Sequence, residues 1–371
     1  MSANPLKRLG ELGQSVWYDY IRRDLYTSPK LRQLIDEDGL KGMTSNPTIF
    51  QNAIAKSDLY DDDIRSAAGK DPAAIYEQLA VTDVRAAADQ FRPVFDAADG
   101  SDGFVSIEVG PHEARDTQDT IAEARRLWKA CGRANVMVKI PGTAEGVPAI
   151  RQCLSEGINI NITLLFGVPR YREVMEAYLS ALEERVKKGE SIERLRSVAS
   201  FFVSRVDTNV DAKLDALIAK GNSAAKSLRA KIGVANARVA YEAFEEVFGA
   251  SRFAALKAKG ARVQKPLWAS TSTKDKTLPD VYYVEALIAP DSVDTVPPET
   301  FEAYRDHGNP KVRIHDELDA AHAAFAALPG VGIDFDTVTR ELEDEGVKKF
   351  SDSYDSLLQA IAAKEKSMRV A

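Results

Sequence analysis

The most constraining feature of this sequence is the alternation of short runs rich in β-branched residues with longer amphipathic stretches. We predict eight such runs to be strands, near residues 15–19, 40–46, 104–109, 135–140, 158–164, 197–203, 265–270 and 281–288. Strands that alternate with helices form parallel sheets through right-handed crossovers. Eight of them favour an α/β fold of the closed (β/α)8 TIM barrel type over the alternative, an open doubly wound sheet.

The segments between the runs carry helical periodicity. The clearest predicted helix follows the fifth run, where apolar residues recur every three or four positions from Tyr171 to Val186 before Gly189 ends the segment. A similar stripe extends from Ile121 to Trp128. Two further helical segments fall outside the repeat: an insertion around 208–262 and a tail from about residue 297.

The length of 371 residues would suit two ordinary domains, but α/β barrels of this size commonly form one. We therefore expect a single domain over residues 1–371. Its barrel core would occupy about 15–290, followed by a C-terminal helical extension at about 291–371. Apolar stripes such as Leu318, Ala321 and Phe325 predict that this tail packs on the barrel.

Composition excludes several classes of protein. With 49 Lys+Arg against 56 Asp+Glu, the net charge of −7 provides no basic footprint for nucleic acid. The N-terminus lacks an apolar signal core and no apolar run approaches ~18 residues, so we expect a cytoplasmic protein without membrane contact. Two cysteines, four unclustered histidines and no GxGxxG motif predict no disulfide framework, no metal and no nucleotide cofactor.

Strand alternation indicates which side chains face the barrel axis. In the fourth run, Val136, Val138 and Ile140 share one face, which suits the helix layer, and Lys139 must then point inward. The third run places Glu108 inward by the same rule. Both residues are predicted at the carboxyl ends of their strands, where TIM barrels carry their active sites.

The fifth run alternates most strictly. Its three isoleucines occupy one face, and Asn159, Asn161 and Thr163 occupy the other. Asp19, at the end of the first run, lies on the same face as Ser15 and Trp17. Taken alone, Asp19 could equally be a turn or capping residue.

An inward lysine beside an inward glutamate has two interpretations. The two side chains could form a buried ion pair, although desolvation often cancels the Coulombic gain of such pairs. Alternatively, burial favours the neutral amine of Lys139, which can then attack a carbonyl group and form a Schiff base. That chemistry also needs a proton donor and a proton acceptor, and Glu108 and Asp19 are the candidates.

Several segments, read together, resemble transaldolase. They are KGMTSNPTIF (41–50), VSIEVGP (105–111), VMVKIPGT (136–143), EGININITLLFGV (156–168), SFFVSRVD (200–207) and WASTSTKD (268–275). The resemblance extends from Asp19 to about Ile288 in matching order, and the long helical tail is similar to the longer bacterial branch of that family. It implies a metal-free, cofactor-free enzyme on a (β/α)8 barrel.

The resemblance also implies a reaction. Transaldolases move a dihydroxyacetone unit between sugar phosphates in the non-oxidative pentose phosphate pathway, converting sedoheptulose 7-phosphate and glyceraldehyde 3-phosphate to erythrose 4-phosphate and fructose 6-phosphate. Lys139 matches the lysine that forms the imine, and Glu108 matches the acid/base that acts through a water held by Thr163. Asp19 matches the group that accepts a proton during cleavage.

The remaining matches concern substrate binding. Asn46 and Asn161 match amides that hold substrate hydroxyls, Ser200 and Phe202 match residues that line the donor site, and Arg205 matches a phosphate-binding arginine. The family's second phosphate arginine, two residues after the serine at Ser270, is replaced here by Ser272. Ser270 remains a candidate phosphate ligand, and Lys274 is predicted to supply the missing charge.

Two other functions remain open at this stage. A Schiff-base aldolase of the fructose 6-phosphate aldolase type would release dihydroxyacetone to water. A non-catalytic barrel that binds sugar phosphates would need Arg205 and Ser270 but not Lys139. The sequence is compatible with a homodimer without fixing the oligomeric state.

Overall fold

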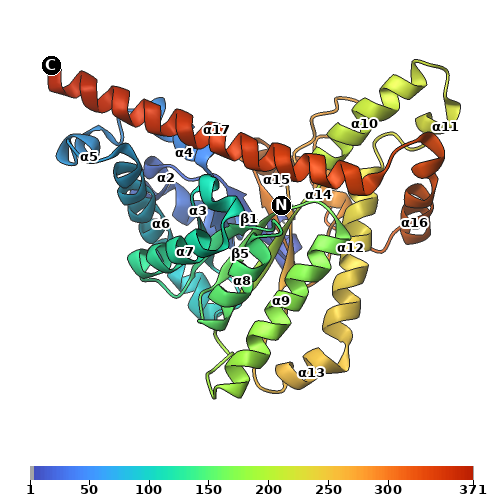
Figure 1. Cartoon of the computed structure of the whole chain (residues 1–371), viewed down its shortest axis with the longest axis horizontal. Coiled ribbons are helices and arrows are strands. Elements are labelled where there is room, and N and C mark those ends of the chain that lie inside the picture. Colours follow the sequence, from blue (N-terminus) through green and yellow to red (C-terminus); the bar gives the residue numbers. More distant parts are fainter. Residues whose placement is uncertain (1–3, 371) are drawn as a thin grey trace.

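Eight parallel strands close into a barrel in which each strand pairs with its neighbours in sequence and β8 pairs with β1 (Figure 1). The computed structural model describes residues 4–370. The predicted TIM barrel is confirmed, because the ring of pairings excludes an open sheet. The strands are β1 (Gln14–Asp19), β2 (Gly42–Thr44), β3 (Phe104–Glu108), β4 (Val136–Pro141), β5 (Ile160–Leu165), β6 (Ser197–Phe202), β7 (Lys265–Ala269) and β8 (Ser292–Val296).

Helices surround the barrel. From the first to the fifth strand they are α1 (Pro5–Glu11), α2 (Arg23–Thr27), α3 (Lys30–Asp38), α4 (Pro47–Ala55), α5 (Asp61–Ser66), α6 (Pro72–Ala97), the 3-10 turn η1 (Pro111–Arg115), α7 (Thr117–Cys131) and α8 (Gly146–Ser155). The later ones are α9 (Val168–Lys187), α10 (Ser204–Ile218), α11 (Ser223–Lys226), α12 (Ile232–Gly249), α13 (Ser251–Lys257), α14 (Tyr282–Ala286), α15 (Pro298–His307), α16 (Leu318–Ala327), the 3-10 turn η2 (Pro329–Val331) and α17 (Phe335–Val370). The predicted helices at α7 and α9, the helical insertion and the helical tail are all confirmed.

One strand prediction is wrong. Residues 281–288 contain α14, and the eighth strand is β8, further along the chain. A short apolar run cannot distinguish a buried helical turn from a strand, and the charged Asp294 interrupts the apolar pattern of the true strand. The barrel therefore extends to Val296, beyond the predicted end of its core at residue 290.

Strand register brings the predicted polar residues together. Glu108 of β3 is in register with Lys139 of β4, and Lys139 is in register with Asn161 of β5. On the other face of β4, Val136, Val138 and Ile140 are fully buried against the helix layer. The polar side chains of these strands thus face the barrel axis and the apolar ones face the helices, as we predicted from the alternation in the sequence.

The C-terminal helix α17 crosses the same end of the barrel at which these residues lie (Figure 1). It contacts α4, α6, α10 and β5, which confirms that the tail packs on the barrel. A Cβ atom at Gly346 would lie 2.9 Å from Cδ2 of Leu164, so glycine permits the close approach of α17 to β5. The hydroxyls of Thr48 in α4 and Ser353 in α17 add a 2.8 Å hydrogen bond.

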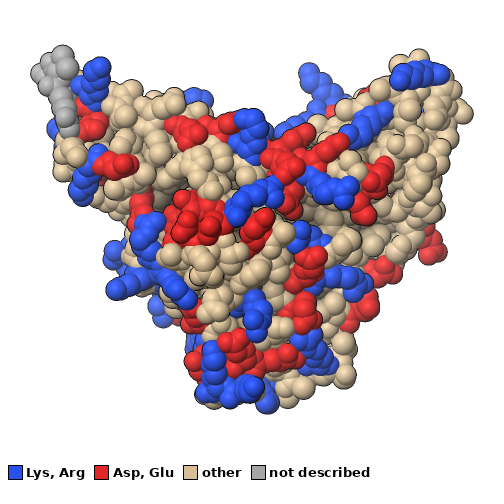
Figure 2. All heavy atoms as spheres, viewed as in Figure 1, with Lys and Arg blue, Asp and Glu red and all other residues tan. Residues whose placement is uncertain are grey.

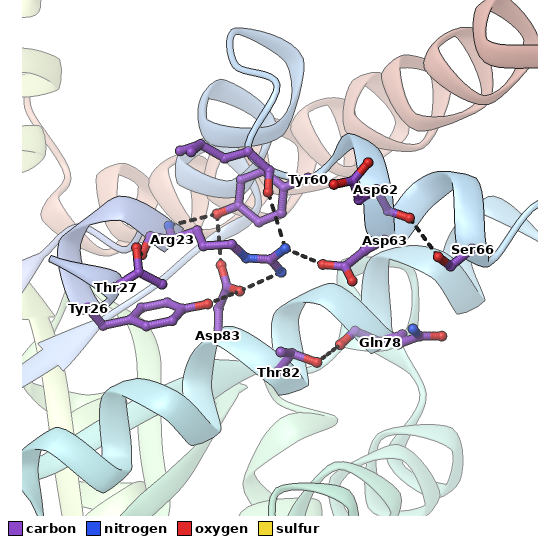
Figure 3. A network of polar contacts seen from close by, with 11 residues as sticks. Arg23, Tyr26, Thr27, Tyr60, Asp62, Asp63, Ser66, Gln78, Thr82 and Asp83 are labelled. Atoms are coloured by element: carbon purple, nitrogen blue, oxygen red, sulfur yellow. Dashed lines mark hydrogen bonds and ion pairs between the residues drawn. The ribbon is translucent and has the colours of Figure 1, made fainter.

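A buried carboxylate connects the first two crossover connections (Figure 3). Asp83 of α6 is fully buried and accepts 2.7 Å hydrogen bonds from the hydroxyls of Tyr26 in α2 and Tyr60. Arg23 of α2 donates to the same carboxylate at 3.1 Å and also pairs with Asp63 of α5. Every oxygen of Asp83 is thus hydrogen-bonded, which offsets the cost of burying its charge.

The surface carries mixed charge. Lys and Arg side chains are interspersed with Asp and Glu over the face shown in Figure 2, in line with the modest net charge of −7. Among residues 4–370, none of the helices combines the length and the apolar character needed to cross a lipid bilayer.

Candidate active site

A cavity of about 180 Å³ opens at the carboxyl end of the barrel. Eight of the eleven residues predicted for the site line it: Asp19, Asn46, Lys139, Thr163, Ser200, Phe202, Arg205 and Ser270. Of the other three, Glu108 and Asn161 contact residues that line the cavity, and Lys274 lines an adjacent one. The structure therefore brings together residues from seven of the eight strands or the loops that follow them.

Lys139 and Glu108 form a buried pair. Nζ of Lys139 lies 3.4 Å from Oε2 of Glu108 and donates a 3.0 Å hydrogen bond to the carbonyl of Ser45. The two side chains are only 7% and 4% exposed. Burial raises the pKa of Glu108, and the nearby Lys139 ammonium opposes that shift. A carboxyl group with a raised pKa can both accept and return a proton near neutral pH.

Asp19 contributes a second carboxyl group. Burial raises its pKa, and the charge of Lys139 and a hydrogen bond from Thr44 oppose the rise. The Thr44 hydroxyl donates to Oδ1 of Asp19 at 2.7 Å and also lies 2.6 Å from the hydroxyl of Thr295 in β8. Asp19 is the last residue of β1 and lines the cavity as part of this hydrogen-bonded chain, so the alternative that it is a turn or capping residue is wrong.

A polar network connects β3, β5 and β6 across the inside of the barrel. The amide of Asn161 donates to the Ser106 hydroxyl at 3.0 Å and accepts from the Ser200 hydroxyl at 2.7 Å. Two buried oxygens remain without a partner among the described residues: Oγ1 of Thr163 and Oε1 of Glu108. Buried polar atoms normally find a partner, so these two oxygens are suited to hold a water or a substrate hydroxyl.

Asn46 has a structural role as well as a place in the cavity. Its Oδ1 accepts a 3.0 Å hydrogen bond from the backbone N–H of Ile49 and so caps α4, with Pro47 in the first turn. The cap fixes the side chain and leaves its amide NH₂ as a donor toward the cavity that it lines.

Arg205 lies in the first turn of α10. Its guanidinium carbon is 4.8 Å from the ring centre of Phe202 and 6.0 Å from that of Phe350 in α17, which are distances for cation–π contact. Burial lowers the pKa of Arg205, and among the described residues it has no ion-pair partner. A partly buried, unpaired guanidinium beside an open cavity is suited to bind an anion.

Ser270 has a left-handed backbone, with φ of 58°, which is uncommon for a residue other than glycine. Its hydroxyl lies 2.8 Å from that of Ser204, and its carbonyl accepts a 3.0 Å hydrogen bond from the Ser204 backbone N–H. These contacts fix Ser270 beside the start of α10, and so beside Arg205.

Three cations surround an adjoining cavity of about 320 Å³. Arg205, Lys274 and Lys349 line it, and among the described residues Glu345 is the one acid in its wall. The charge of Arg205, with burial and the charge of Lys274, lowers the pKa of Lys349, so the cations repel one another. A dianion bound between them would relieve that repulsion.

Sequence reasoning missed several residues of the site. Lys349 and Phe350 belong to the tail, which was predicted to pack on the barrel but not to face the site. The sequence feature that could have indicated a tail residue in the phosphate site was the basic pair Lys348 and Lys349 immediately before Phe350. Thr44, Thr295 and Glu299 also line the cavity and were not predicted. In the described part of the chain, no group of three His, Cys, Asp or Glu side chains is arranged to hold a metal ion.

Comparison with known proteins agrees with this geometry. The model of the family described as Transaldolase/Fructose-6-phosphate aldolase matches residues 16–361. The chain belongs to this family. The match includes every strand from β2 to β8 and most of α17, so the C-terminal helix that closes the site lies within the family region.

Individual relatives in the Transaldolase/Fructose-6-phosphate aldolase family are similar over nearly their whole length. A transaldolase of Frankia alni is 48% identical over 97% of both chains. A transaldolase of Acidothermus cellulolyticus is 49% identical over 96% of both chains, and transaldolase 2 of a Nostoc species is 44% identical over 99% of both. The resemblance noted in the sequence motifs is thus confirmed across the chain.

Proposed function

We propose that this chain is a transaldolase that transfers a dihydroxyacetone unit between sugar phosphates through an imine on Lys139. The observation that supports this proposal most directly is the contact of the buried Lys139 amine with Glu108 at 3.4 Å, in a cavity that also contains Asp19. Its relatives of the same family, which are named transaldolases, support the same reaction.

The first half of the proposed reaction forms the imine. Lys139 gives its ammonium proton to Glu108, and the neutral amine attacks C2 of a ketose phosphate. Glu108 then returns a proton to the hydroxyl of the carbinolamine, which leaves as water while the C=N bond forms. The unpartnered oxygens of Glu108 and Thr163 hold that water.

The second half breaks and remakes a carbon–carbon bond. Asp19 takes the proton of the C4 hydroxyl, the C3–C4 bond breaks, and its electrons pass to the imine nitrogen as an aldose phosphate leaves. The enamine on Lys139 then attacks the aldehyde of a second aldose phosphate, and Asp19 returns the proton. Asn46, Asn161 and Ser200 hold substrate hydroxyls during both steps.

The phosphate of the substrate binds among the three cations that line the adjoining cavity, Arg205, Lys274 and Lys349. Arg205, with the Ser270 hydroxyl beside it, is the principal ligand, because a planar guanidinium donates two hydrogen bonds to a phosphate. Lys274 and Lys349 replace the family's second arginine as point charges around the adjoining cavity. Phe202 supports Arg205 and lines the donor site.

Helix α17 favours transfer over hydrolytic release. It contributes Phe350 to the wall of the cavity and so restricts the entry of water while the enamine waits for an acceptor. A fructose 6-phosphate aldolase would instead release dihydroxyacetone. Measuring cleavage of fructose 6-phosphate with and without erythrose 4-phosphate separates the two reactions, since only a transaldolase depends strongly on the acceptor.

Borohydride trapping tests the imine. Reduction in the presence of fructose 6-phosphate, followed by peptide mass mapping, is expected to leave a three-carbon adduct on Lys139. The Lys139→Met variant should form no adduct. A wild-type protein that binds the substrate but forms no adduct would instead be a sugar-phosphate sensor.

Two further proposals concern the setting of the enzyme. A cytoplasmic location fits a chain whose described helices contain no membrane span, and cell fractionation tests it. A homodimer stays a prediction, which size-exclusion chromatography with light scattering would decide. A membrane-bound fraction or a monomer would contradict the respective proposal.

A further inference from the structure

A separate cavity of about 210 Å³ lies at the opposite, amino-terminal end of the barrel. Its apolar wall includes five inward-facing strand residues: Trp17, Phe104, Met137, Val198 and Val293. They occupy the same faces of β1, β3, β4, β6 and β8 that carry Asp19, Glu108, Lys139, Ser200 and Thr295 at the other end. The proposed reaction uses none of these apolar residues.

Arg196 enters this cavity from the loop before β6. Only 5% of the residue is exposed, and Nη1 donates to the carbonyls of Glu193 and Leu195 at 2.6 and 2.9 Å. Its Nε is buried without a hydrogen-bond partner, and it pairs with no carboxylate among the described residues. A buried guanidinium is costly unless an anion compensates its charge.

The rim of the cavity adds further positive charge. Lys257, Arg262 and Lys265 line it, and of these only Arg262 pairs with a described acid, the exposed Asp99, at 3.5 Å. Asp102, one of the two acids in the wall, already accepts hydrogen bonds from Ser15, from Nε1 of Trp17 and from the backbone N–H of Gly103.

The other acid in the wall is Asp291, which is exposed in the turn directly before β8. The cavity is therefore lined by four cations against two acids, and Arg196, which has no ion-pair partner among the described residues, lies above an apolar floor. That combination suits a ligand with a charged head and an apolar body.

We propose that this cavity is a second ligand site, which binds a small organic anion with an apolar body. The carboxylate or phosphate of the ligand pairs with Arg196, and its apolar part lies against Trp17, Met137 and Val198. The size fits a single ring, because an apolar cavity of ~150 Å³ in another protein accepts benzene. A sugar phosphate lacks the apolar part, so the site is distinct in specificity from the mouth of the barrel.

Benzoate and phenyl phosphate are suitable probes, and fructose 6-phosphate is the comparison ligand. Binding would be followed by calorimetry and by ligand-observed NMR on the full chain. We expect saturable millimolar binding of at least one probe to the wild type, and the preferred probe identifies the head group. Each probe is expected to bind as tightly to protein whose Lys139 has been trapped by borohydride as to untreated protein, because the carboxyl end of the barrel does not contribute to this site.

Variants locate the site. Arg196→Gln should weaken probe binding by about tenfold or more, because it removes a charge-assisted contact. Lys257→Glu, on the exposed rim, should weaken binding about threefold to tenfold, and Lys259→Glu, an exposed neighbour that does not line the cavity, should leave it unchanged. All three should retain wild-type turnover of fructose 6-phosphate with erythrose 4-phosphate.

Two results would overturn the proposal. One is no saturable binding of either probe to the wild type, and the other is a pair of variants that fail to differ: a folded Arg196→Gln protein that binds the probes as tightly as the wild type, or equal binding by Lys257→Glu and Lys259→Glu. If Arg196→Gln fails to fold, comparing probe binding by Lys257→Glu and Lys259→Glu still tests the proposal. If the wild type shows no transfer of dihydroxyacetone, the proposed function is contradicted but the second ligand site is not, since probe binding does not depend on that reaction.

Discussion

The hydroxyl of Thr271 donates a 2.8 Å hydrogen bond to Oδ1 of Asp294, a fully buried carboxyl group on β8. Thr271 directly follows Ser270, whose left-handed backbone sets the position of its hydroxyl beside Arg205. Asp294 thereby anchors the loop that carries a proposed phosphate ligand. Its other oxygen is buried without a partner among the described residues.

Asp294 is expected to make stability depend on pH. Burial raises its pKa from 3.8 to about 7. Because the folded pKa lies above the unfolded one, the stabilising contribution is complete below pH 3.8 and is lost as the pH rises to about 7. The loss is at most about 4 kcal/mol, from about 1.4 kcal/mol per pKa unit.

The Asp294→Asn variant isolates this group. It cannot ionise, so its free energy of unfolding should improve relative to wild type between pH 4 and pH 7 (the interval set by the two pKa values). Denaturant unfolding of both proteins at several pH values measures the difference. A constant difference across that interval would contradict the assignment.

Glu108→Gln should slow formation of the imine on Lys139 by about a hundredfold or more, the usual effect of losing a general acid/base. Substrate binding should survive, because Gln keeps the size and one acceptor oxygen. Rapid-quench borohydride trapping measures the rate. Glu113→Gln is the matched control on the nearby turn η1 and should trap at the wild-type rate. An unchanged trapping rate for Glu108→Gln would remove its proposed role.

Lys349→Met tests the contribution of α17 to phosphate binding. We expect KM for fructose 6-phosphate to rise about tenfold, equivalent to about 1.4 kcal/mol, with kcat nearly unchanged. Lys348→Met is the control on the same helix, because Lys348 is exposed and pairs with Asp352. Equal KM values for the two variants would exclude Lys349 from the phosphate site.

The sequence was sufficient to predict the parts of the site that depend on local periodicity. Alternation along single strands placed Lys139, Glu108 and Asn161 on the inward faces, and the structure confirms those orientations. The roles of these residues stay predictions until the variants above are measured. The dual use of Asn46, as cap of α4 and as cavity wall, was not visible in its motif.

The residues that sequence reasoning missed depend on long-range packing. Lys349 reaches Arg205 only because α17 crosses the barrel, and no local pattern specifies that path. Thr295 was missed with its strand, since β8 is short and Asp294 interrupts the apolar pattern of its sequence. The adjoining cation cavity follows from the same packing of the tail.

The Asp83 network in Figure 3 should stabilise the fold without affecting chemistry. Asp83→Ala removes a buried carboxylate and leaves Arg23, Tyr26 and Tyr60 without their common partner, so we expect a loss of about 3–5 kcal/mol. Tyr26→Phe, which deletes one hydrogen bond to the charged group, should cost about 1.5–3 kcal/mol.

Denaturant unfolding measures both losses in the network. Thr82→Ala is the neighbouring control on α6, because the exposed Thr82 hydroxyl donates a hydrogen bond to the Gln78 carbonyl within the same helix and, in the described part of the chain, bonds to no residue of the network. Turnover per folded molecule should match wild type in all three variants, since the network lies outside the catalytic cavity. Equal stability of Asp83→Ala and Thr82→Ala would show that the buried carboxylate contributes nothing net, which occurs when desolvation cancels its hydrogen bonds.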